Sequence, residues 1–344
     1  MHAHRAGARP AIAIVGGESL LGKEVSELMQ DAHLAADIRL IASYDTEGSN
    51  VLTRGREELA VLTSLQAADL GSARVVILAG SKESSRKAHE QIRGARSAPL
   101  VIDLTGGLEE RPETRLRAPM AESPQGEPAA FQTEGAIQVI AHPAAIALAL
   151  FFTQLQKAGT IRRSVVHVFE PVSERGQAGL DELQKQTVAL LSLKPLTKDV
   201  FDEQVSFNLL TAYGSESPHS LGEIELKIER HLASLLAGSR APMPSLRLIH
   251  APVFHGYSLS LWVEFEENPG VAAIAQALSS SNIDVRTAEH GPPSNVGAAG
   301  QSGITVGAIS ADRNHPRACW FWVVADNLHI AAENAVEVVR EHLE

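Results

Sequence analysis

Short, continuous apolar runs punctuate the first part of the chain, and such runs are typical of strands buried on both faces of a sheet. Four runs predict strands, at residues 11–15, 38–42, 75–79 and 100–103. The first passes through a glycine-rich turn, Gly16–Gly22, into a stretch with helical spacing of apolar residues, Lys23–Gln30. Strand, glycine turn, helix and strand in this order predict the opening of a doubly wound parallel sheet.

The pattern changes in the middle of the chain. A polar, proline-bearing segment, Glu109–Pro128, predicts a loop, and a strand at Gln138–Ala141 and a helix at Ala144–Gln156 follow it. Beyond this point strands predominate, at residues 164–169, 247–252, 258–266, 304–310 and 318–324. Only two helices interrupt them, at residues 177–191 and 220–236. This half is therefore expected to hold a mixed or antiparallel sheet packed with helices.

Two segments complete the second half. The stretch His290–Gly303 is rich in glycine and proline and predicts a mobile loop, whereas Asn327–Leu343 predicts an amphipathic closing helix. All three tryptophans, Trp262, Trp320 and Trp322, lie in predicted strands. We expect them to pack the sheet against helices or against a dimer partner.

Composition limits the class of protein. The chain has 344 residues, enough for two domains, and its 44% hydrophobic and 21% charged content is typical of a globular protein. The longest apolar run is too short to span a bilayer, and no segment resembles a secretion signal, so we expect a cytoplasmic protein without a membrane partner. The net charge of −11 argues against nucleic acid as a partner. The single cysteine, Cys319, excludes an intramolecular disulfide.

The glycine turn has the sequence of a phosphate-binding loop, because backbone N–H groups at the start of a helix can face a pyrophosphate. The candidate cofactor contacts are Gly16, Gly17, Ser19, Leu20, Leu21, Gly22 and, after a later strand, Gly80. Ser19 replaces an inner glycine, and Glu18 adds a negative charge beside the phosphate position. Both changes are expected to weaken binding, unless Glu18 points away.

Asp45 follows the second predicted strand, about where an acidic residue binds the ribose 2′-hydroxyl of NAD. A carboxylate at this place favours NAD over NADP, because it repels a 2′-phosphate. The alternative interpretation is that Asp45 serves only the turn Tyr44–Ser49.

Seven short segments, in order, resemble the aspartate-semialdehyde dehydrogenase family. They are Gly16–Gly22, Val101–Asp103, Ile140–Pro143, Val172-Ser173 with Gly176, Phe207-Asn208, Pro252–Phe254 with Gly256, and Ala325–Leu328. The resemblance covers nearly the whole chain. It implies an α/β protein with a Rossmann-type domain over residues 10–142, completed by a helix at 326–344, that binds NAD or NADP with Asn327 among the contacts. It further implies an α+β dimerisation domain with a mixed sheet over residues 143–325.

The family's reaction needs a cysteine thiol that attacks the aldehyde and a histidine that acts as base, before hydride passes to NADP and phosphate cleaves the thioester. The position of the thiol falls on Ala145, and a methyl group cannot attack a carbonyl. The position of the base falls on Tyr257, whose usual pKa of about 10 makes it a poor base at neutral pH. His255, two residues earlier, would share a strand face with Tyr257 and is the candidate substitute.

The resemblance also locates the positions that would bind anions. The family's active-site glutamine falls on Glu170, its phosphate-binding arginine on Glu109 and its substrate-binding arginine on His250. Lys227 is the one basic position that persists, unless it is an exposed helix lysine. Since negative charge now stands where anions would bind, we expect the family's substrate to be rejected.

These substitutions favour a non-catalytic paralogue, a pseudoenzyme that keeps the scaffold and binds nucleotide weakly, NAD before NADP. One alternative is an oxidoreductase that passes hydride directly to an aldehyde or ketone, with Tyr257 or His255 as the acid. A second alternative is a structural partner of an active relative, which implies a heteromeric complex; otherwise we expect a homodimer. No cluster of cysteine and histidine has the spacing of a zinc site, so we expect no metal.

Overall fold

A computed structural model describes residues 9–44, 50–54, 59–65, 68–93, 98–122, 136–287 and 290–343. The chain divides into two units, which are described separately. The first unit comprises Met1–Pro119, Ser123–Ile140 and Ala332–Glu344, and the second comprises Met120–Glu122 and Ala141–Ala331. No helix of the described residues is long and apolar enough to cross a membrane.

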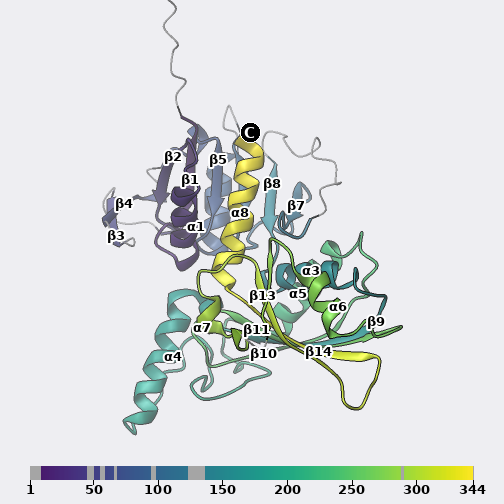
Figure 1. Ribbon diagram of the computed structural model, residues 1–344. Coiled ribbons are helices and arrows are strands. Elements are labelled where there is room, and N and C mark those ends of the chain that lie inside the picture. The colour runs from purple at the N-terminus through teal and green to yellow at the C-terminus, as the bar shows by residue number, and fades with distance from the viewer. Residues whose placement is uncertain are drawn as a thin grey trace, which may run out of the picture. The chain divides into compact units, whose positions relative to one another are not determined.

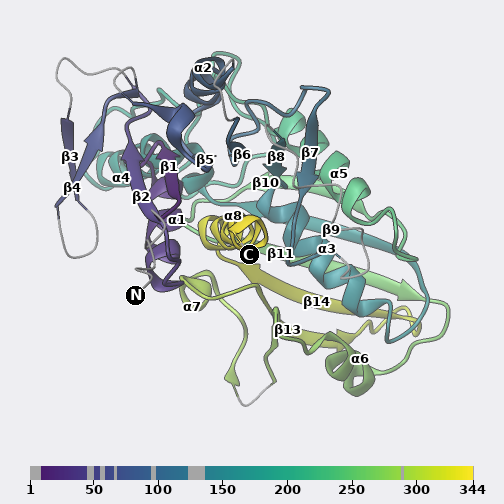
Figure 2. The ribbon, with the colours of Figure 1, turned by 90° about the horizontal axis from the view of Figure 1, so that it is seen from above.

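The first unit is built on an eight-stranded sheet with the strand order β3-β4-β2-β1-β5-β6-β8-β7 (Figures 1 and 2). Its strands are β1 (Ala11–Val15), β2 (Asp37–Ile41), β3 (Asn50–Arg54), β4 (Leu59–Thr63), β5 (Val75–Leu78), β6 (Leu100–Asp103), β7 (Thr114–Arg117) and β8 (Ile137–Ile140). All neighbours are parallel except β3 and β4. The prediction of a doubly wound parallel sheet is confirmed.

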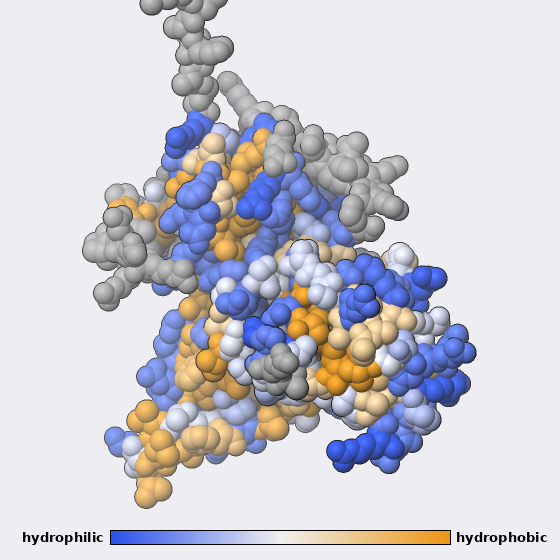
Figure 3. Space-filling model, in the orientation of Figure 1, coloured by the Kyte–Doolittle hydropathy of each residue, from blue (hydrophilic) through white to orange (hydrophobic). Residues whose placement is uncertain are grey.

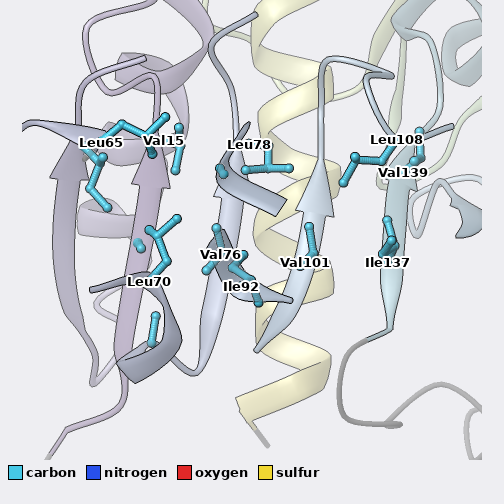
Figure 4. Packing of buried hydrophobic residues seen from close by; sticks show 14 residues of the cluster. Val15, Leu65, Leu70, Val76, Leu78, Ile92, Val101, Leu108, Ile137 and Val139 are labelled. Carbon is cyan, nitrogen blue, oxygen red and sulfur yellow. The ribbon is translucent and has the colours of Figure 1, made fainter. Parts of the chain in front are cut away.

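Helices cover this sheet, and they are α1 (Leu20–Asp31), α2 (Lys82–Ile92) and the part of α8 (Asn327–Leu343) that belongs to the unit. Val76, Leu78 and Val101 pack with Ile92 of α2 in one buried cluster, and α8 passes behind the same strands (Figure 4). Because both faces are covered, β5 is buried at every residue, which explains its uninterrupted apolar sequence.

The turn after β1 depends on glycine. Gly16 has a φ of +90°, and a β-carbon at this position would lie 2.3 Å from the backbone nitrogen of Gly80. A β-carbon on Gly22 would lie 2.0 Å from the carbonyl oxygen of Gly16. The turn, the start of α1 and the end of β5 therefore lock together through backbone contacts that no larger residue permits.

The second unit holds a six-stranded sheet with the order β10-β9-β11-β14-β13-β12. Its strands are β9 (Ile161–Glu170), β10 (Ser245–His250), β11 (Tyr257–Phe265), β12 (Ile283–Val285), β13 (Ile304–Ala311) and β14 (Ala318–Ala325). Its helices are α3 (Pro143–Leu155), α4 (Gly176–Leu191), α5 (Leu221–Leu235), α6 (Val271–Leu278) and α7 (Asn295–Ala298). Pairs β9–β10 and β12–β13 are parallel and the others antiparallel, so the predicted mixed sheet is confirmed.

Two predicted loops contain regular structure. Strand β7 lies within Glu109–Pro128, of which residues 123–128 are outside the described residues, and the short helix α7 lies within His290–Gly303. The sequence analysis also missed β3, β4, β12, α2 and α6. Helix α2, KESSRKAHEQI, buries mainly small and polar side chains, so no apolar stripe marks it.

We expect Gly16→Ala to lower the free energy of unfolding by at least about 2 kcal/mol, because alanine strains the positive φ and its methyl group meets the backbone of Gly80. Urea unfolding followed by circular dichroism measures this loss. Gly238→Ala is the matched control, since a β-carbon there meets nothing within 4 Å. Equal effects of the two substitutions would contradict the prediction.

Candidate functional site

The turn between β1 and α1 retains groups that can bind an anion. Ser19 is the N-cap of α1: its Oγ accepts a hydrogen bond from the N–H of Gly22 (2.8 Å) and donates one to the carbonyl oxygen of Ala79 (2.7 Å). The N–H groups of Leu20 and Leu21 have no hydrogen-bond partner among the described residues. They stand at the positive end of the helix dipole, where a phosphate group can be bound.

Two other predicted cofactor positions, Gly17 and Gly80, pack closely against neighbouring protein atoms. Gly80 contacts Gly16, and a β-carbon on Gly17 would lie 2.9 Å from the side chain of Leu62. Asp45 lies outside the described residues, so its predicted role at the ribose stays a prediction.

A buried polar cluster occupies the second unit, where three neighbouring strands end or begin. Glu170 is the last residue of β9, His250 the last of β10 and Tyr257 the first of β11. Strand β10 pairs His250 with Glu170, and antiparallel β11 pairs Ser258 with Phe169, which places Tyr257 opposite Glu170. Side chains opposite each other in register share a face, so the three converge. All three are 0% exposed.

Arg175 neutralises the charge of Glu170. Its Nη2 donates to both carboxylate oxygens of Glu170, at 2.9 and 2.8 Å, and the hydroxyl of Tyr213 donates to the same carboxylate at 2.9 Å. Burial alone would lower the pKa of the Arg175 guanidinium, but the carboxylate of Glu170 raises it. The guanidinium therefore stays charged, and it is engaged by the protein itself.

His250 cannot act as a second cationic group. Its Nδ1 lies 3.0 Å from the hydroxyl oxygen of Tyr213, and its Nε2 is buried with no hydrogen-bond partner in the described part of the chain. Burial, followed by repulsion from Arg175, lowers the pKa of His250 to about 4. The imidazole is therefore neutral at physiological pH.

Glu174 adds a second carboxyl group to the cluster. Its Oε1 accepts a hydrogen bond from Nδ2 of Asn327 at 2.8 Å. Burial, followed by the negative charge of Glu170, raises the pKa of Glu174 to about 7, although Arg175 and Lys227 act in the opposite direction. Lys227 of α5 is partly buried, and its role as a substrate-site residue stays a prediction.

The start of α3 lies beside this cluster. His142 caps the helix, its backbone N–H donates to Nδ1 of His231 (2.8 Å), and its Nε2 lies 3.9 Å from a carboxylate oxygen of Glu174. The rings of His142 and Tyr257 have centroids 6.0 Å apart. Ala145, in the first turn of α3, is 0% exposed. The predicted position of the thiol therefore lies in the helix turn that His142, a neighbour of Tyr257, caps; residue 145 is alanine and residue 257 is tyrosine.

Tyr257 has an environment that opposes ionisation. Its hydroxyl is buried and has no hydrogen-bond partner among the residues that the structure describes, and burial, followed by the charge of Glu174, raises its pKa. It can donate a proton in a hydrogen bond, but it cannot be the base.

The expectations for His255 and Asn327 need correction. His255 precedes Gly256, whose φ is +82°, and β11 begins only at Tyr257, so the argument that a strand puts both side chains on one face is wrong. The amide of Asn327 is engaged by protein, with Oδ1 accepting from Gly256 and Ser173 and Nδ2 donating to Glu174, and is not free for a cofactor.

Glu109 belongs to the first unit. It follows a loop that Asp103 fixes, because the Asp103 carboxylate accepts hydrogen bonds from the N–H groups of Thr105 and Leu108, both at 2.8 Å. Its side chain is partly buried. Glu109, the predicted vestige of the phosphate site, therefore belongs to a different unit from Glu170 and His250.

His142, Glu170 and Glu174 form the kind of group that can hold a metal, with one ligand atom from each lying within 4.8 Å of the others. Sequence spacing missed this group because its members come from three different elements. A divalent cation would compete with Arg175 for Glu170 and would lie near a second cation, Lys227. The donor set therefore fits a metal poorly.

Three site residues escaped the sequence analysis: Glu174, Arg175 and Tyr213. The signal for the first two was the charged pair Glu174-Arg175, which follows shortly after the apolar strand that ends at Glu170. Tyr213 lies in an irregular segment far along the chain, and no local pattern marks it.

Comparison with known proteins supports the resemblance. A profile described as "Semialdehyde dehydrogenase, dimerisation domain" matches residues 153–330. The USG-1 protein homolog of Pseudomonas aeruginosa is 30% identical over 331 residues, which cover 94% of this chain and 95% of that protein. The chain belongs to the semialdehyde dehydrogenase family.

Solved structures agree with this assignment. A probable aspartate-semialdehyde dehydrogenase from Pseudomonas aeruginosa is 28% identical and superposes with a TM-score of 0.83, covering 98% of this chain and 100% of the other. Aspartate-semialdehyde dehydrogenase from Candida albicans, solved with NADP, shares the fold at 14% identity and a TM-score of 0.65, over 97% of this chain and 99% of its own.

The raised pKa of Glu174 predicts a pH-dependent contribution to stability. Its carboxyl group is protonated in the folded state up to about pH 7, and in the unfolded state only below about 4.5. The contribution of the protonated carboxyl group to the free energy of unfolding is therefore fully present below about pH 4.5. As the pH rises toward about 7, this contribution is lost, and the free energy of unfolding falls by on the order of 3 kcal/mol. Glu174→Gln should gain stability relative to the wild type over this range, as measured by urea unfolding at several pH values. The exposed Glu267→Gln is the control, and a variant curve parallel to the wild type would contradict the prediction.

Proposed function

We propose that this chain is a non-catalytic paralogue of aspartate-semialdehyde dehydrogenase. The observation that supports this most directly is Ala145: the first turn of α3 presents a buried methyl group where the family's reaction needs a thiol. A helix start would lower the pKa of a cysteine and activate it, but it has no such effect on alanine.

The anion site is also blocked by the protein itself. The guanidinium of Arg175 is bound to both oxygens of Glu170, so a substrate carboxylate would have to displace an internal carboxylate from a buried pair. Separating such a pair leaves an uncompensated buried charge, which typically costs about 3–5 kcal/mol. Chemistry and recognition are therefore lost together.

The proposed nucleotide domain is residues 10–142 and 326–344, which overlap mainly with the first unit, although residues 120–122, 141–142 and 326–331 belong to the second. The free N–H groups of Leu20 and Leu21 support phosphate binding, and we infer a weak preference for NAD over NADP. The proposed dimerisation domain is residues 143–325.

The second candidate function is reduction of an aldehyde or ketone by direct hydride transfer. Glu174 favours it, because a buried carboxyl group with a pKa of about 7 is typical of acid–base sites. Turnover of a carbonyl compound with NADH that Glu174→Gln abolishes would favour this candidate over the first.

The open face of the second sheet supports a homodimer. Helices α3, α5 and α6 lie on one face (Figure 1), and the register brings Val165, Trp262 and Trp320 into one row on the other. Val165 is 39% exposed and Trp320 is 41% exposed. A further apolar surface covers the end of α4 (Figure 3), where Leu191 is 76% exposed. Apolar, aromatic surface of this kind is typical of interfaces between subunits. A heteromeric partner on the same face is the alternative.

We predict no phosphate-dependent oxidation of aspartate semialdehyde, with NADP reduction as the assay. Restoring the thiol by Ala145→Cys should not restore turnover, because Tyr257 cannot act as base and Glu170 occupies Arg175. Turnover by the wild type above an empty control would disprove the proposal, and turnover by the variant alone would restrict the defect to the thiol.

The dimer is tested by Val165→Glu, which puts a charge in the middle of the open sheet face. We expect the wild type to have twice the 36.7 kDa mass of one chain in light scattering at micromolar concentration, and the variant to dissociate. Leu226→Glu is the control, since Leu226 is 60% exposed on α5, on the helix-covered side of the sheet. A monomeric wild type would overturn the proposal.

A further inference from the structure

Glu18 has a fixed place that its position in the glycine turn does not suggest. Its side chain leaves the turn and reaches the carboxyl end of β2, where Oε1 accepts a hydrogen bond from the N–H of Ser43 at 3.0 Å. The hydroxyl of Ser43 donates to the same carboxylate. Two donors from one residue therefore anchor the carboxylate away from the N–H groups of Leu20 and Leu21.

The place it reaches matters for nucleotide recognition. In doubly wound folds, an acidic side chain at the carboxyl end of the second strand binds the ribose 2′-hydroxyl of NAD. Strand β2 ends at Ile41, and Ser43 follows two residues later. The carboxylate of Glu18 thus lies at this end of β2, although it comes from a different part of the chain.

The charge of Glu18 is not neutralised nearby. Among the described residues, Glu18 forms no ion pair, and its recorded partners are the two donors of Ser43. Arg39, the arginine of β2, is paired with Asp37 at the opposite end of the strand (3.2 Å). A 2′-phosphate at the end of β2 would therefore meet a negative charge, whereas a 2′-hydroxyl would meet a hydrogen-bond acceptor.

We propose that Glu18 is the residue that selects NAD against NADP in this protein, by accepting a hydrogen bond from the ribose 2′-hydroxyl and repelling a 2′-phosphate. This inference rests on the proposed binding of nucleotide by the first unit. It assigns the selectivity to the turn after β1 and makes it independent of Asp45.

The test is a calorimetric titration of the full-length protein with NADH and with NADPH, for the wild type and three variants. Glu18→Gln keeps the size and one acceptor oxygen but removes the charge. Ser43→Ala keeps the charge but removes one anchoring donor. Asp31→Asn is the matched control, because it removes one negative charge from the exposed last residue of α1. Circular dichroism melting verifies that each variant is folded.

We expect the wild type to bind NADH at least about tenfold more tightly than NADPH, and Glu18→Gln to reduce this ratio about tenfold, mainly by gaining affinity for NADPH. Ser43→Ala should reduce this affinity ratio less than Glu18→Gln does. Asp31→Asn should leave the ratio within about twofold of the wild-type value. A ratio that Glu18→Gln does not change would overturn the role of Glu18 but leave nucleotide binding intact. Absence of binding of either nucleotide to every folded form would overturn both proposals.

Discussion

The buried pair of Glu170 and Arg175 is the interaction on which the second unit's polar cluster depends. A carboxylate that is 0% exposed is tolerated only if a cation and hydrogen-bond donors surround it, and Arg175 with Tyr213 supplies both. Burial is the largest cause of the pKa shifts of both neighbours, and the pair adds to it: the guanidinium further lowers the pKa of His250, and the carboxylate further raises the pKa of Glu174. The ion pair thus acts in the same direction as burial on both titratable neighbours.

This arrangement explains why the substitutions in the site form a consistent set. With glutamate at position 170, a free guanidinium beside it is captured by the protein, and an imidazole at position 250 then fits because it stays neutral. A second full positive charge at His250 would face Arg175 across a buried space. The charges of this buried cluster are therefore compensated within the protein itself.

Sequence reasoning succeeded where backbone and periodicity determine the outcome. The buried strands of the first unit are continuous apolar runs, and the helices α3, α4, α5 and α8 have apolar faces or clear start signals, so both sheets were predicted. It failed where structure depends on contacts between distant segments. Helix α2 lacks an apolar stripe, and Tyr213 joins the site from an irregular segment, so neither leaves a local signal. His255 was misplaced because the positive φ of Gly256 turns the chain just before β11.

The contrast between the two units has a physical origin. The glycine turn of the first unit is constrained by backbone contacts: a β-carbon at Gly16 or Gly22 would lie less than 2.5 Å from another backbone atom, so these residues are needed for folding whether or not a nucleotide binds. The side chains at positions 145 and 257 are buried, and exchange there is limited by volume and by buried polar groups rather than by a positive φ. Folding alone therefore accounts for the glycine turn, whereas it does not require a thiol at position 145. A preserved glycine turn accordingly indicates the fold, whereas evidence for bound nucleotide has to come from side chains that folding does not require, such as Glu18.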